Sequence, residues 1–314
     1  MEQERGSGGR SGEEGGKITS PSYLKKVLQE QGLAPHRRMG QHFLIDENIL
    51  QKIIAAARLE PGDHVLDIGA GPGALSLSMA RQVSRVLAIE WDSGLAALLR
   101  REARRRGLEN ISVVEADVRR LDLEETCRAA WGESLLPPPG DPAGPGPAIK
   151  VVANLPYYLT TPLLFKLLRG ALPLRHLVLM VQLEVARRIV ASPATRDYGV
   201  LTLLCQYYTE PQLLFNVSRH VFYPQPAVDS AVIGLQPRAA PPVAVPDETL
   251  FWRVVDAAFS QRRKTLLNAL EGTASLDREG WRRVLERAGV DPARRGETLS
   301  LERFAMISEM LYNK

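Results

Sequence analysis

The sequence predicts an α/β fold, in which a mainly parallel β-sheet is covered by helices on both faces, followed by a small C-terminal all-helical domain. The first observation is an alternation of short apolar runs with helix-spaced apolar residues between positions 64 and 181. Such alternation is typical of parallel strands joined by crossover helices. The second observation is a proline-rich stretch, 237–246, after which only helix-spaced patterns follow.

The individual elements follow from local signals. Ser20 and Pro21 begin a helix that Gly32 ends, and Asp46 caps a second helix. The last two predicted strands follow each other closely, so we expect them to pair antiparallel at the end of the sheet. The predicted strands are 64–68, 85–89, 111–115, 150–153, 176–181, 212–217 and 228–235; the further helices are 74–83, 95–106, 163–168, 183–190, 198–208, 251–259, 264–270, 281–288 and 301–311.

Composition also predicts the domain organisation. Residues 1–19 are expected to form a disordered tail, because their Gly/Glu/Arg-rich start has no apolar core and reads as neither a signal nor a transit peptide. Residues 20–238 form the main domain, with a proline- and glycine-rich surface insertion at 132–148. Residues 246–314 form the helical domain.

Charge and cysteine usage limit the class of protein. The 314 residues are 45% hydrophobic and 24% charged, which is ordinary for a soluble globular protein. No apolar run reaches the roughly 18 residues of a membrane span. Cys127 and Cys205 lie in apolar contexts without metal or redox spacing, so we expect buried free thiols in a reducing compartment. The net charge of +4 permits a nucleic-acid partner without requiring one.

A glycine loop, Asp67–Ala74, joins the first strand to its crossover helix. Gly69 and Gly71 let the backbone approach a ligand closely. Glu90 ends the next strand about 20 positions after Gly69 and can accept both hydroxyls of a ribose. This spacing fits NAD as well as S-adenosylmethionine. Pro72 removes an N–H that a pyrophosphate would need, which favours the second cofactor.

Two further strand ends carry polar side chains. Asp117 ends the third strand and can accept the amino group of an adenine, although a turn cap would also explain this residue. The fourth strand stops at Asn154, at the sheet edge where ligands bind in open α/β folds. A glycine loop, two acids and an amide, ending four successive strands in this order, form a specific combination.

The turn after the fourth strand suits a planar amine. Pro156 prevents the strand from continuing in a central position. The Asn154 amide oxygen and the Leu155 carbonyl can each accept an N–H of an exocyclic amino group, while Tyr157 stacks on the heterocycle. Taken alone, these four residues are equally consistent with an Asx-type turn whose tyrosine packs in the core.

With these residues the sequence resembles Rossmann-like S-adenosylmethionine-dependent methyltransferases, and more specifically the KsgA/RsmA family of ribosomal RNA small-subunit adenine N6,N6-dimethyltransferases. The resemblance covers residues 20–314, without the insertion. The matching stretches are Gly40–Leu44, Asp67–Gly73, Asn154–Tyr157, Phe222–Ser230 and Phe259–Asn268. It implies dimethylation of the N6 amino groups of two adjacent adenines in a 3′-terminal hairpin of 16S (small-subunit) rRNA. It also implies a role in ribosome biogenesis, in which the partner is the rRNA or the 30S pre-ribosomal particle. The protein is then expected to be a monomer in the cytoplasm.

The resemblance also implies roles for individual residues. His42 and Leu44 would close over the methionine part of the cofactor, and His42 departs from the asparagine that relatives often have. The other implied cofactor contacts are Gly69 and Gly71 beneath it, Glu90 on the ribose, Asp117 on the adenine, and Asn154 on both cofactor and target. The implied catalytic residues are Asn154, Leu155, Pro156, Tyr157 and Phe222, the last as a second stacking surface; the implied RNA contacts are Arg262, Arg263 and Lys264.

Three alternatives remain open at this stage. A nicotinamide-dependent dehydrogenase would use the glycine loop and Glu90, but would leave the Asn154 turn without a role. A non-catalytic ribosome-assembly or transcription factor could keep the fold without the activity. An antibiotic-resistance enzyme that methylates large-subunit rRNA shares most motifs, but the stretch Phe259–Asn268 favours the small-subunit class.

Overall fold

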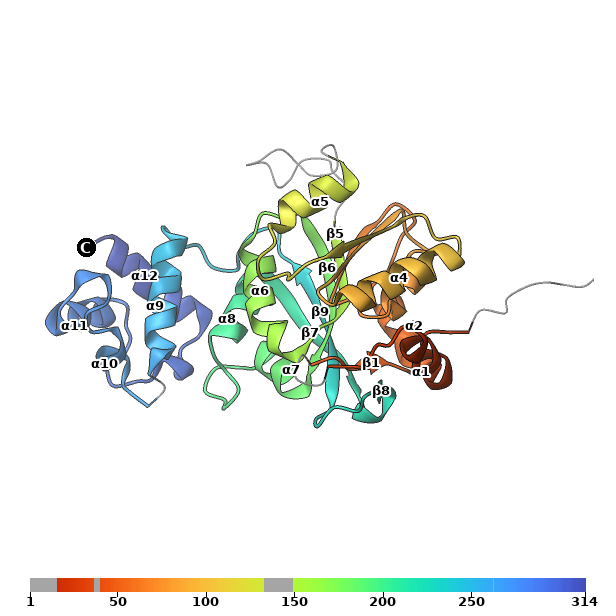
Figure 1. Cartoon of the computed structure of the whole chain (residues 1–314). Coiled ribbons are helices and arrows are strands. Elements are labelled where there is room, and N and C mark those ends of the chain that lie inside the picture. Colours follow the sequence, from red (N-terminus) through yellow and green to blue (C-terminus); the bar gives the residue numbers. More distant parts are fainter. Residues whose placement is uncertain (1–15, 37–39, 133–148, 262) are drawn as a thin grey trace, which may run out of the picture.

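A seven-stranded sheet forms the centre of the computed structural model, which describes residues 16–36, 40–132, 149–261 and 263–314 (Figure 1). The strands β2 to β6 are parallel, and β9 pairs antiparallel with both β6 and β7. The order is β4 (Ile111–Glu115), β3 (Arg85–Glu90), β2 (His64–Ile68), β5 (Ile149–Asn154), β6 (Leu174–Gln182), β9 (Ser230–Pro237) and β7 (Thr209–Val217). The predicted α/β class and the antiparallel end of the sheet are confirmed, and β9 lies between β6 and β7.

Helices cover both faces of this sheet. Alternate residues of β5 point to opposite sides: Val151 belongs to the apolar cluster beneath one helical layer, and Val152 to the cluster beneath the other. The first layer contains α5 (Leu123–Trp131), α6 (Thr160–Arg169), α7 (Leu183–Ile189) and α8 (Val200–Tyr208). The second contains α1 (Pro21–Glu30), α2 (Glu47–Ala56), α3 (Ala74–Met79) and α4 (Ser93–Arg105). Near-continuous apolar strands are what a sheet buried on both faces requires.

Short elements were the ones that the sequence pattern missed. Phe43–Leu44 (β1) and Phe222–Tyr223 (β8) pair antiparallel as a separate two-stranded sheet, and two residues are too few for any periodicity. The helix α5 was not predicted, although Asp122 caps it by accepting from the backbone N–H groups of Glu124 and Glu125. The predicted insertion lies outside the described residues except for Gly132.

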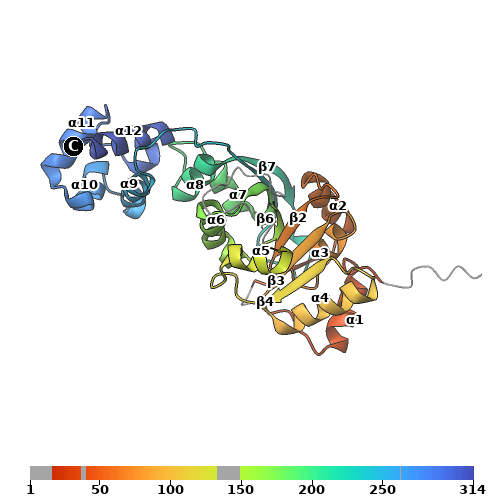
Figure 2. The same cartoon turned by 90° about the horizontal axis from the view of Figure 1, so that it is seen from above.

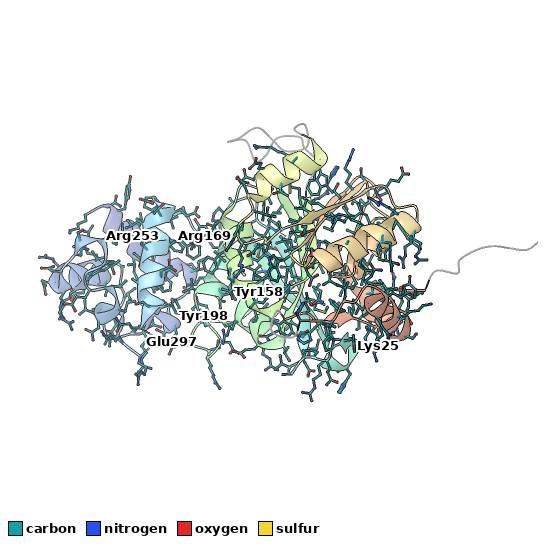
Figure 3. The ribbon with its side chains drawn as sticks, in the orientation of Figure 1. Lys25, Tyr158, Arg169, Tyr198, Arg253 and Glu297 are labelled. Carbon is teal, nitrogen blue, oxygen red and sulfur yellow. The ribbon has the colours of Figure 1, made fainter. Side chains whose placement is uncertain are left out.

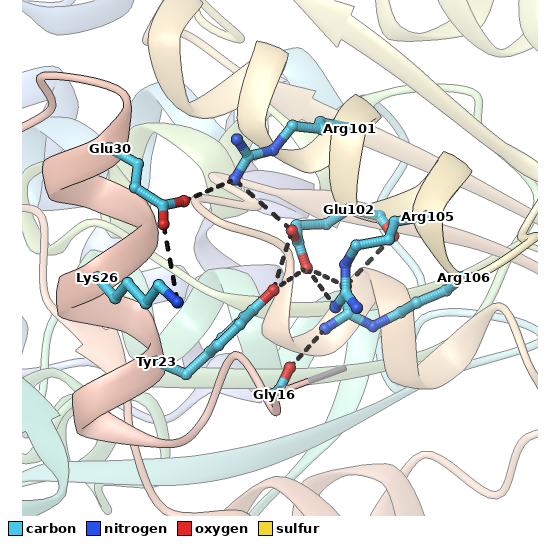
Figure 4. A network of polar contacts seen from close by, with 8 residues as sticks. All are labelled: Gly16, Tyr23, Lys26, Glu30, Arg101, Glu102, Arg105 and Arg106. Atoms are coloured by element: carbon cyan, nitrogen blue, oxygen red, sulfur yellow. Dashed lines mark hydrogen bonds and ion pairs between the residues drawn. The ribbon is translucent and has the colours of Figure 1, made fainter. Parts of the chain in front are cut away.

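The N-terminal helix is attached to α4 through a buried carboxylate (Figure 4). Glu102 accepts from the Tyr23 hydroxyl at 3.1 and 3.2 Å and from Arg105 Nη2 at 3.0 Å, and it also pairs with Arg106. Ile18 and Thr19 are buried. The described part of the predicted tail is therefore packed at residues 18 and 19, and residues 1–15 of the tail lie outside the described part.

The C-terminal helices form a group at one end of the molecule, beside α8 (Figures 1 and 2). The rings of Tyr207 on α8 and Phe251 on α9 stack with centroids 5.3 Å apart, and the Tyr198 hydroxyl donates to the Leu299 carbonyl at 2.9 Å. This group comprises α9 (Glu248–Ser260), α10 (Leu266–Leu270), α11 (Arg278–Arg287) and α12 (Leu301–Tyr312). It shares one apolar cluster with the sheet domain, and the predicted division into a separate helical domain at 246–314 stays a prediction. Within the described residues, no helix has the length and apolar character to cross a membrane.

An ion pair is buried at the amino-terminal end of β5. Lys150 Nζ lies 2.7 Å from Asp63 Oδ2, with both side chains 5% exposed. Asp63 Oδ2 also accepts from the Glu60 backbone N–H at 2.6 Å, and Lys150 donates to the Arg58 carbonyl. Removing one partner of such a pair leaves the other charge buried and uncompensated.

We therefore expect Lys150→Met to lower the free energy of unfolding by about 3–5 kcal/mol. Urea denaturation followed by circular dichroism would measure this loss. Arg175→Ala provides a matched control, because Arg175 pairs with Glu60 at 3.8 Å on the exposed surface. Its removal should change the free energy of unfolding by less than about 1 kcal/mol, and equal losses in the two variants would contradict the argument.

Candidate functional site

One cavity opens at the carboxyl ends of β2, β3, β4 and β5, where the sequence placed its candidate residues. Its empty volume, open solvent included, is about 970 Å³. Ten of the eleven predicted catalytic and cofactor residues line it: His42, Leu44, Gly69, Gly71, Glu90, Asp117, Asn154, Leu155, Pro156 and Tyr157. The remaining residue, Phe222, is not part of the lining. The cavity therefore brings together residues that are more than a hundred positions apart in the chain.

The glycine loop forms the floor of the cavity. Gly69 has a φ of +71°, and a Cβ atom at this position would lie 2.8 Å from Pro156 Cδ of the turn after β5. A side chain would therefore separate the glycine loop from the amide-bearing turn. Gly71 donates its backbone N–H to Glu90 Oε2 at 2.7 Å, and the Asp92 N–H donates to Glu90 Oε1 at 2.9 Å. Burial raises the pKa of Glu90 in spite of these two bonds.

Asp67 is a functional candidate that the sequence reasoning did not assign. It lines the same cavity and is fully buried. The Ser76 hydroxyl donates to its Oδ2 at 2.5 Å, whereas Oδ1 has no hydrogen-bond partner among the residues that the structure describes. Burial, with a further contribution from the charge of Glu90, raises the pKa of Asp67 to about 7. An acid inside an otherwise apolar strand, His64–Ile68, was the available signal.

Asp117 lies at the edge of the cavity and is paired with Arg119. Arg119 Nε lies 3.0 Å from Oδ1, and Arg119 Nη2 lies 2.7 Å from Oδ2. The hydrogen bond from this guanidinium lowers the pKa of Asp117. Asp117 is therefore a charged acceptor, as its predicted contact with an amino group requires.

The orientation of the Asn154 amide follows from one hydrogen bond. Asn154 Nδ2 donates to the His42 backbone carbonyl at 3.0 Å. Because a carbonyl can only accept, the NH₂ end of the amide must face residue 42, and Oδ1 is left as an acceptor on the other side. The Leu155 N–H donates to the Met180 carbonyl at 3.1 Å, which fixes the backbone of the turn.

The segment carrying His42 is held by the pairing of β1 with β8. The register joins Phe43 to Tyr223 and Leu44 to Phe222. His42 Nδ1 lies 2.6 Å from the Pro224 carbonyl, so this ring nitrogen carries the proton and donates. The histidine thus has a defined position beside Asn154, although relatives of the resembled family often have asparagine there.

Two tyrosines follow Pro156. The Tyr157 hydroxyl is 2.9 Å from Ser230 Oγ, and its ring lies 5.6 Å from the His42 ring with a tilt of 32°. Tyr158 is 45% exposed and also lines the cavity, as does the exposed Trp91. Tyr157 itself lines the cavity and is only partly buried, which favours the predicted site over the core alternative, and its stacking role stays a prediction.

The predicted role of Phe222 as a second stacking surface is not supported. Phe222 is 4% exposed and belongs to the apolar cluster that contains Leu44, Val178 and Met180. Side chains alternate along a strand, and in β8 it is Phe222 that faces this cluster while Tyr223 is partly exposed. Phe222 packs beneath the site as a core residue.

The predicted RNA contacts lie in the segment between α9 and α10. Arg263 and Lys264 are exposed there, whereas Arg262 lies outside the described residues. Their assignment to RNA stays a prediction.

Comparison with known proteins gives a consistent result. A family model described as "Ribosomal RNA adenine dimethylase" matches residues 33–311. The Ribosomal RNA small subunit methyltransferase A of Pelotomaculum thermopropionicum is 46% identical over 297 residues, covering 93% of this chain and 96% of the relative. The protein of the same name from Moorella thermoacetica is 45% identical over 294 residues, covering 94% and 98%.

Solved structures show the same fold. A dimethyladenosine transferase from Plasmodium falciparum superposes with a TM-score of 0.68 at 24% identity, over 85% of this chain and 96% of that structure. The 23S rRNA methyltransferase ErmE superposes with a TM-score of 0.59 at 26% identity, over 86% and 99%.

The raised pKa of Asp67 predicts a pH-dependent stability. The pKa is about 7 in the folded chain against an ordinary 3.8, so the folded state holds a proton that the unfolded state releases. The resulting stabilisation is complete below the ordinary value and is lost as the pH rises through the folded value. We expect Asp67→Asn to gain stability relative to the parent as the pH is raised from about 5 to about 8. Unfolding midpoints of both proteins at these two pH values would measure the gain, and an equal difference at both would contradict it.

Proposed function

The chain belongs to the KsgA/RsmA family of ribosomal RNA adenine dimethylases, and from this premise we propose that it dimethylates the N6 amino groups of two adjacent adenines in a 3′-terminal hairpin of 16S rRNA. As a member of this family it is an S-adenosylmethionine-dependent methyltransferase. The readings as a dehydrogenase and as a non-catalytic factor are therefore wrong. The observation that carries the proposal is the oriented amide of Asn154 beside the glycine loop.

The residues of the cavity fit S-adenosylmethionine. This cofactor supplies a methyl group on a positively charged sulfur. Glu90 is a buried carboxylate at the position where a ribose would bind, and each of its oxygens keeps acceptor capacity beyond its one backbone bond. The orphaned Asp67 Oδ1 offers a further buried acceptor to a cationic ligand. We assign the ribose to Glu90, the adenine to Asp117 and the methionine side to His42 and Leu44.

We assign the target amine to the turn at Asn154. The N6 lone pair of adenine is delocalised into the ring, so the nitrogen is a poor nucleophile. When Asn154 Oδ1 and the Leu155 carbonyl accept its two hydrogens, the nitrogen becomes more pyramidal and its lone pair is aimed at the methyl group. Alignment supplies much of the rate, since well-oriented pairs reach effective molarities of roughly 10⁵–10⁸ M. Transfer would form the N–C bond as the C–S bond breaks and a neutral thioether leaves. The methylated nitrogen is then positively charged and acidic and would lose its proton to water, so no strong base is needed.

Stacking holds the target base in this geometry. We assign the stacking to Tyr157, which lines the cavity and whose hydroxyl contact with Ser230 at 2.9 Å holds the tip of the side chain in place. Stacking of one base on an aromatic ring is worth about 1–3 kcal/mol, which offsets part of the cost of flipping the adenine out. The buried side chain of Phe222 attaches β8 to the apolar cluster that contains Leu44.

The small-subunit assignment rests on the relatives, which are 40–46% identical and named for the small subunit. ErmE, named for 23S rRNA, is 26% identical. We propose that the substrate is presented on the small subunit or its 30S precursor during ribosome biogenesis. We further expect a cytoplasmic monomer, with Arg262, Arg263 and Lys264 contacting RNA.

We expect Asn154→Ala to lower kcat by roughly 10²–10³-fold, because one of the two acceptors for the amine is lost. Cofactor affinity should weaken only partly, since Glu90 and the glycine loop remain. The assay is tritiated methyl transfer to small-subunit particles lacking the modification, followed by nucleoside analysis. Asn216→Ala, at an exposed position of β7, is the control. Near-normal turnover of Asn154→Ala, or no methylation of adenine by the parent, would reject the proposal.

Tyr157 and Phe222 should behave differently on substitution. Tyr157→Ala removes the stacking surface, so the fluorescence of 2-aminopurine at the target position should no longer report a flipped and stacked base. Phe222→Leu should leave that signal intact and lower the free energy of unfolding by about 1 kcal/mol, as a core substitution does. If Phe222→Leu abolished the fluorescence change and Tyr157→Ala did not, the assignment of the two rings would be reversed.

A further inference from the structure

An arginine with no assigned role holds two residues at the mouth of the cavity. Arg119 Nε lies 3.0 and 3.1 Å from the two carboxylate oxygens of Asp117, and Nη2 lies 2.7 Å from Oδ2. Its guanidinium carbon is 5.8 Å from the ring centroid of Tyr158. Asp117 and Tyr158 line the cavity, whereas Arg119 does not. The arginine therefore lies just outside the opening, in contact with its rim.

The backbone that carries Arg119 is fixed to the helix α6. Lys166 Nζ donates to the carbonyls of Val118 at 2.9 Å and Arg119 at 3.3 Å, and also to that of Leu121. The α6 helix itself begins two residues after Tyr158. The loop, the helix and the catalytic turn thus form one connected unit, and little conformational freedom remains to be lost when the guanidinium binds a ligand.

Part of the guanidinium is available. Of its five N–H groups, the Nε–H and one Nη2–H point at Asp117. The two Nη1 hydrogens and the second Nη2 hydrogen have no hydrogen-bond partner among the residues that the structure describes, and the side chain is 54% exposed. Arg119 can therefore bind a second anion while it remains bound to Asp117.

The cavity is lined by acidic side chains, so an anionic ligand needs a positively charged group nearby. Asp67, Glu90 and Asp117 line it, and the described lining contains no lysine or arginine. A nucleotide whose base enters the cavity brings its phosphates to the rim, where carboxylates repel them. A guanidinium fork matches the geometry of phosphate oxygens better than an ammonium does.

We propose that Arg119 binds a phosphodiester group of the RNA strand next to the target adenine, and that Asp117 orients the guanidinium for this contact. The inference rests on the proposed function, because it requires an RNA substrate whose base enters the cavity. Asp117 then has two roles. It lines the cavity where the cofactor would bind, and its carboxylate holds Arg119, which contacts the RNA.

The competing explanation is a solvated ion pair that only stabilises the loop. The two explanations predict opposite signs for Asp117→Asn. If charge alone mattered, removing a carboxylate near the rim would strengthen RNA binding. If Asp117 orients Arg119, removing the carboxylate releases the arginine and weakens RNA binding.

The test measures binding of an unmodified small-subunit rRNA hairpin, without cofactor, over a range of salt concentrations. We expect Arg119→Gln to weaken binding several-fold and to reduce the slope of log Kd against log salt by about 0.7, the value for one phosphate contact on a single strand. Arg119→Lys should fall between the parent and Arg119→Gln, because it keeps the charge without the fork. Asp117→Asn should weaken binding although it removes a negative charge.

Arg120→Gln is the matched control, because Arg120 is exposed one residue further along and its charge acts on Asp117 without a side-chain hydrogen bond or ion pair to it. It should affect binding much less than Arg119→Gln, and unfolding midpoints would verify that all variants are folded. Equal effects of Arg119→Gln and Arg120→Gln, or tighter binding by Asp117→Asn, would overturn the inference. If the parent itself failed to bind and methylate the RNA, the proposed function would fail instead.

Discussion

The hydrogen bond from Asn154 Nδ2 to the His42 carbonyl determines which end of one amide is offered to the target base. It joins the end of the central strand β5 to the segment before β1, which is itself held by β8 and by the contact between His42 and the Pro224 carbonyl. Three segments far apart in the chain therefore determine the orientation of one hydrogen-bond acceptor, Asn154 Oδ1. Since alignment rather than acid–base chemistry drives the reaction we propose, the scaffold around Asn154 matters as much as the residue itself.

The sequence predicted the features that depend on local pattern and missed those that depend on distant contacts. The buried central strand His64–Ile68 and the partly buried edge strand Ile111–Glu115 were predicted with their bounds, because parallel strands of this kind are short apolar runs with polar ends. The face of β8 on which the Phe222 side chain lies could not be predicted. Two residues are too few to show an alternating pattern, and the partner strand β1 lies almost 180 positions away. The raised pKa of Asp67 likewise depends on burial that only the folded chain shows.

The acidic and basic side chains around the cavity occupy different places. Burial raises the pKa values of Asp67 and Glu90 inside the cavity, while the guanidinium of Arg119 lowers that of Asp117 at the rim. Buried carboxylates favour a cationic ligand, because a positive charge replaces the solvation that they have lost. An RNA substrate, which is a polyanion, instead needs a surface that carries positive charge. A chain with a net charge of only +4 can satisfy both because three of its acids line the cavity, whereas no lysine or arginine belongs to the described lining.

The attachment of the C-terminal helices limits how RNA could reach the cavity. In Figure 3 Tyr198 lies on the side of the sheet domain that faces the helical group, and its hydroxyl donates to the Leu299 carbonyl at 2.9 Å. The Ala194 N–H donates to the Glu297 carbonyl at 2.8 Å, and Arg169 of α6 lies over the ring of Trp252 with its guanidinium carbon 4.5 Å from the centroid. Because α6 begins at Thr160, directly after the Asn154–Tyr157 turn, these contacts connect the helical group to the cavity through packed side chains. An RNA that touched both parts, as the proposed contacts of Arg263 and Lys264 require, would have to match one fixed spacing between them.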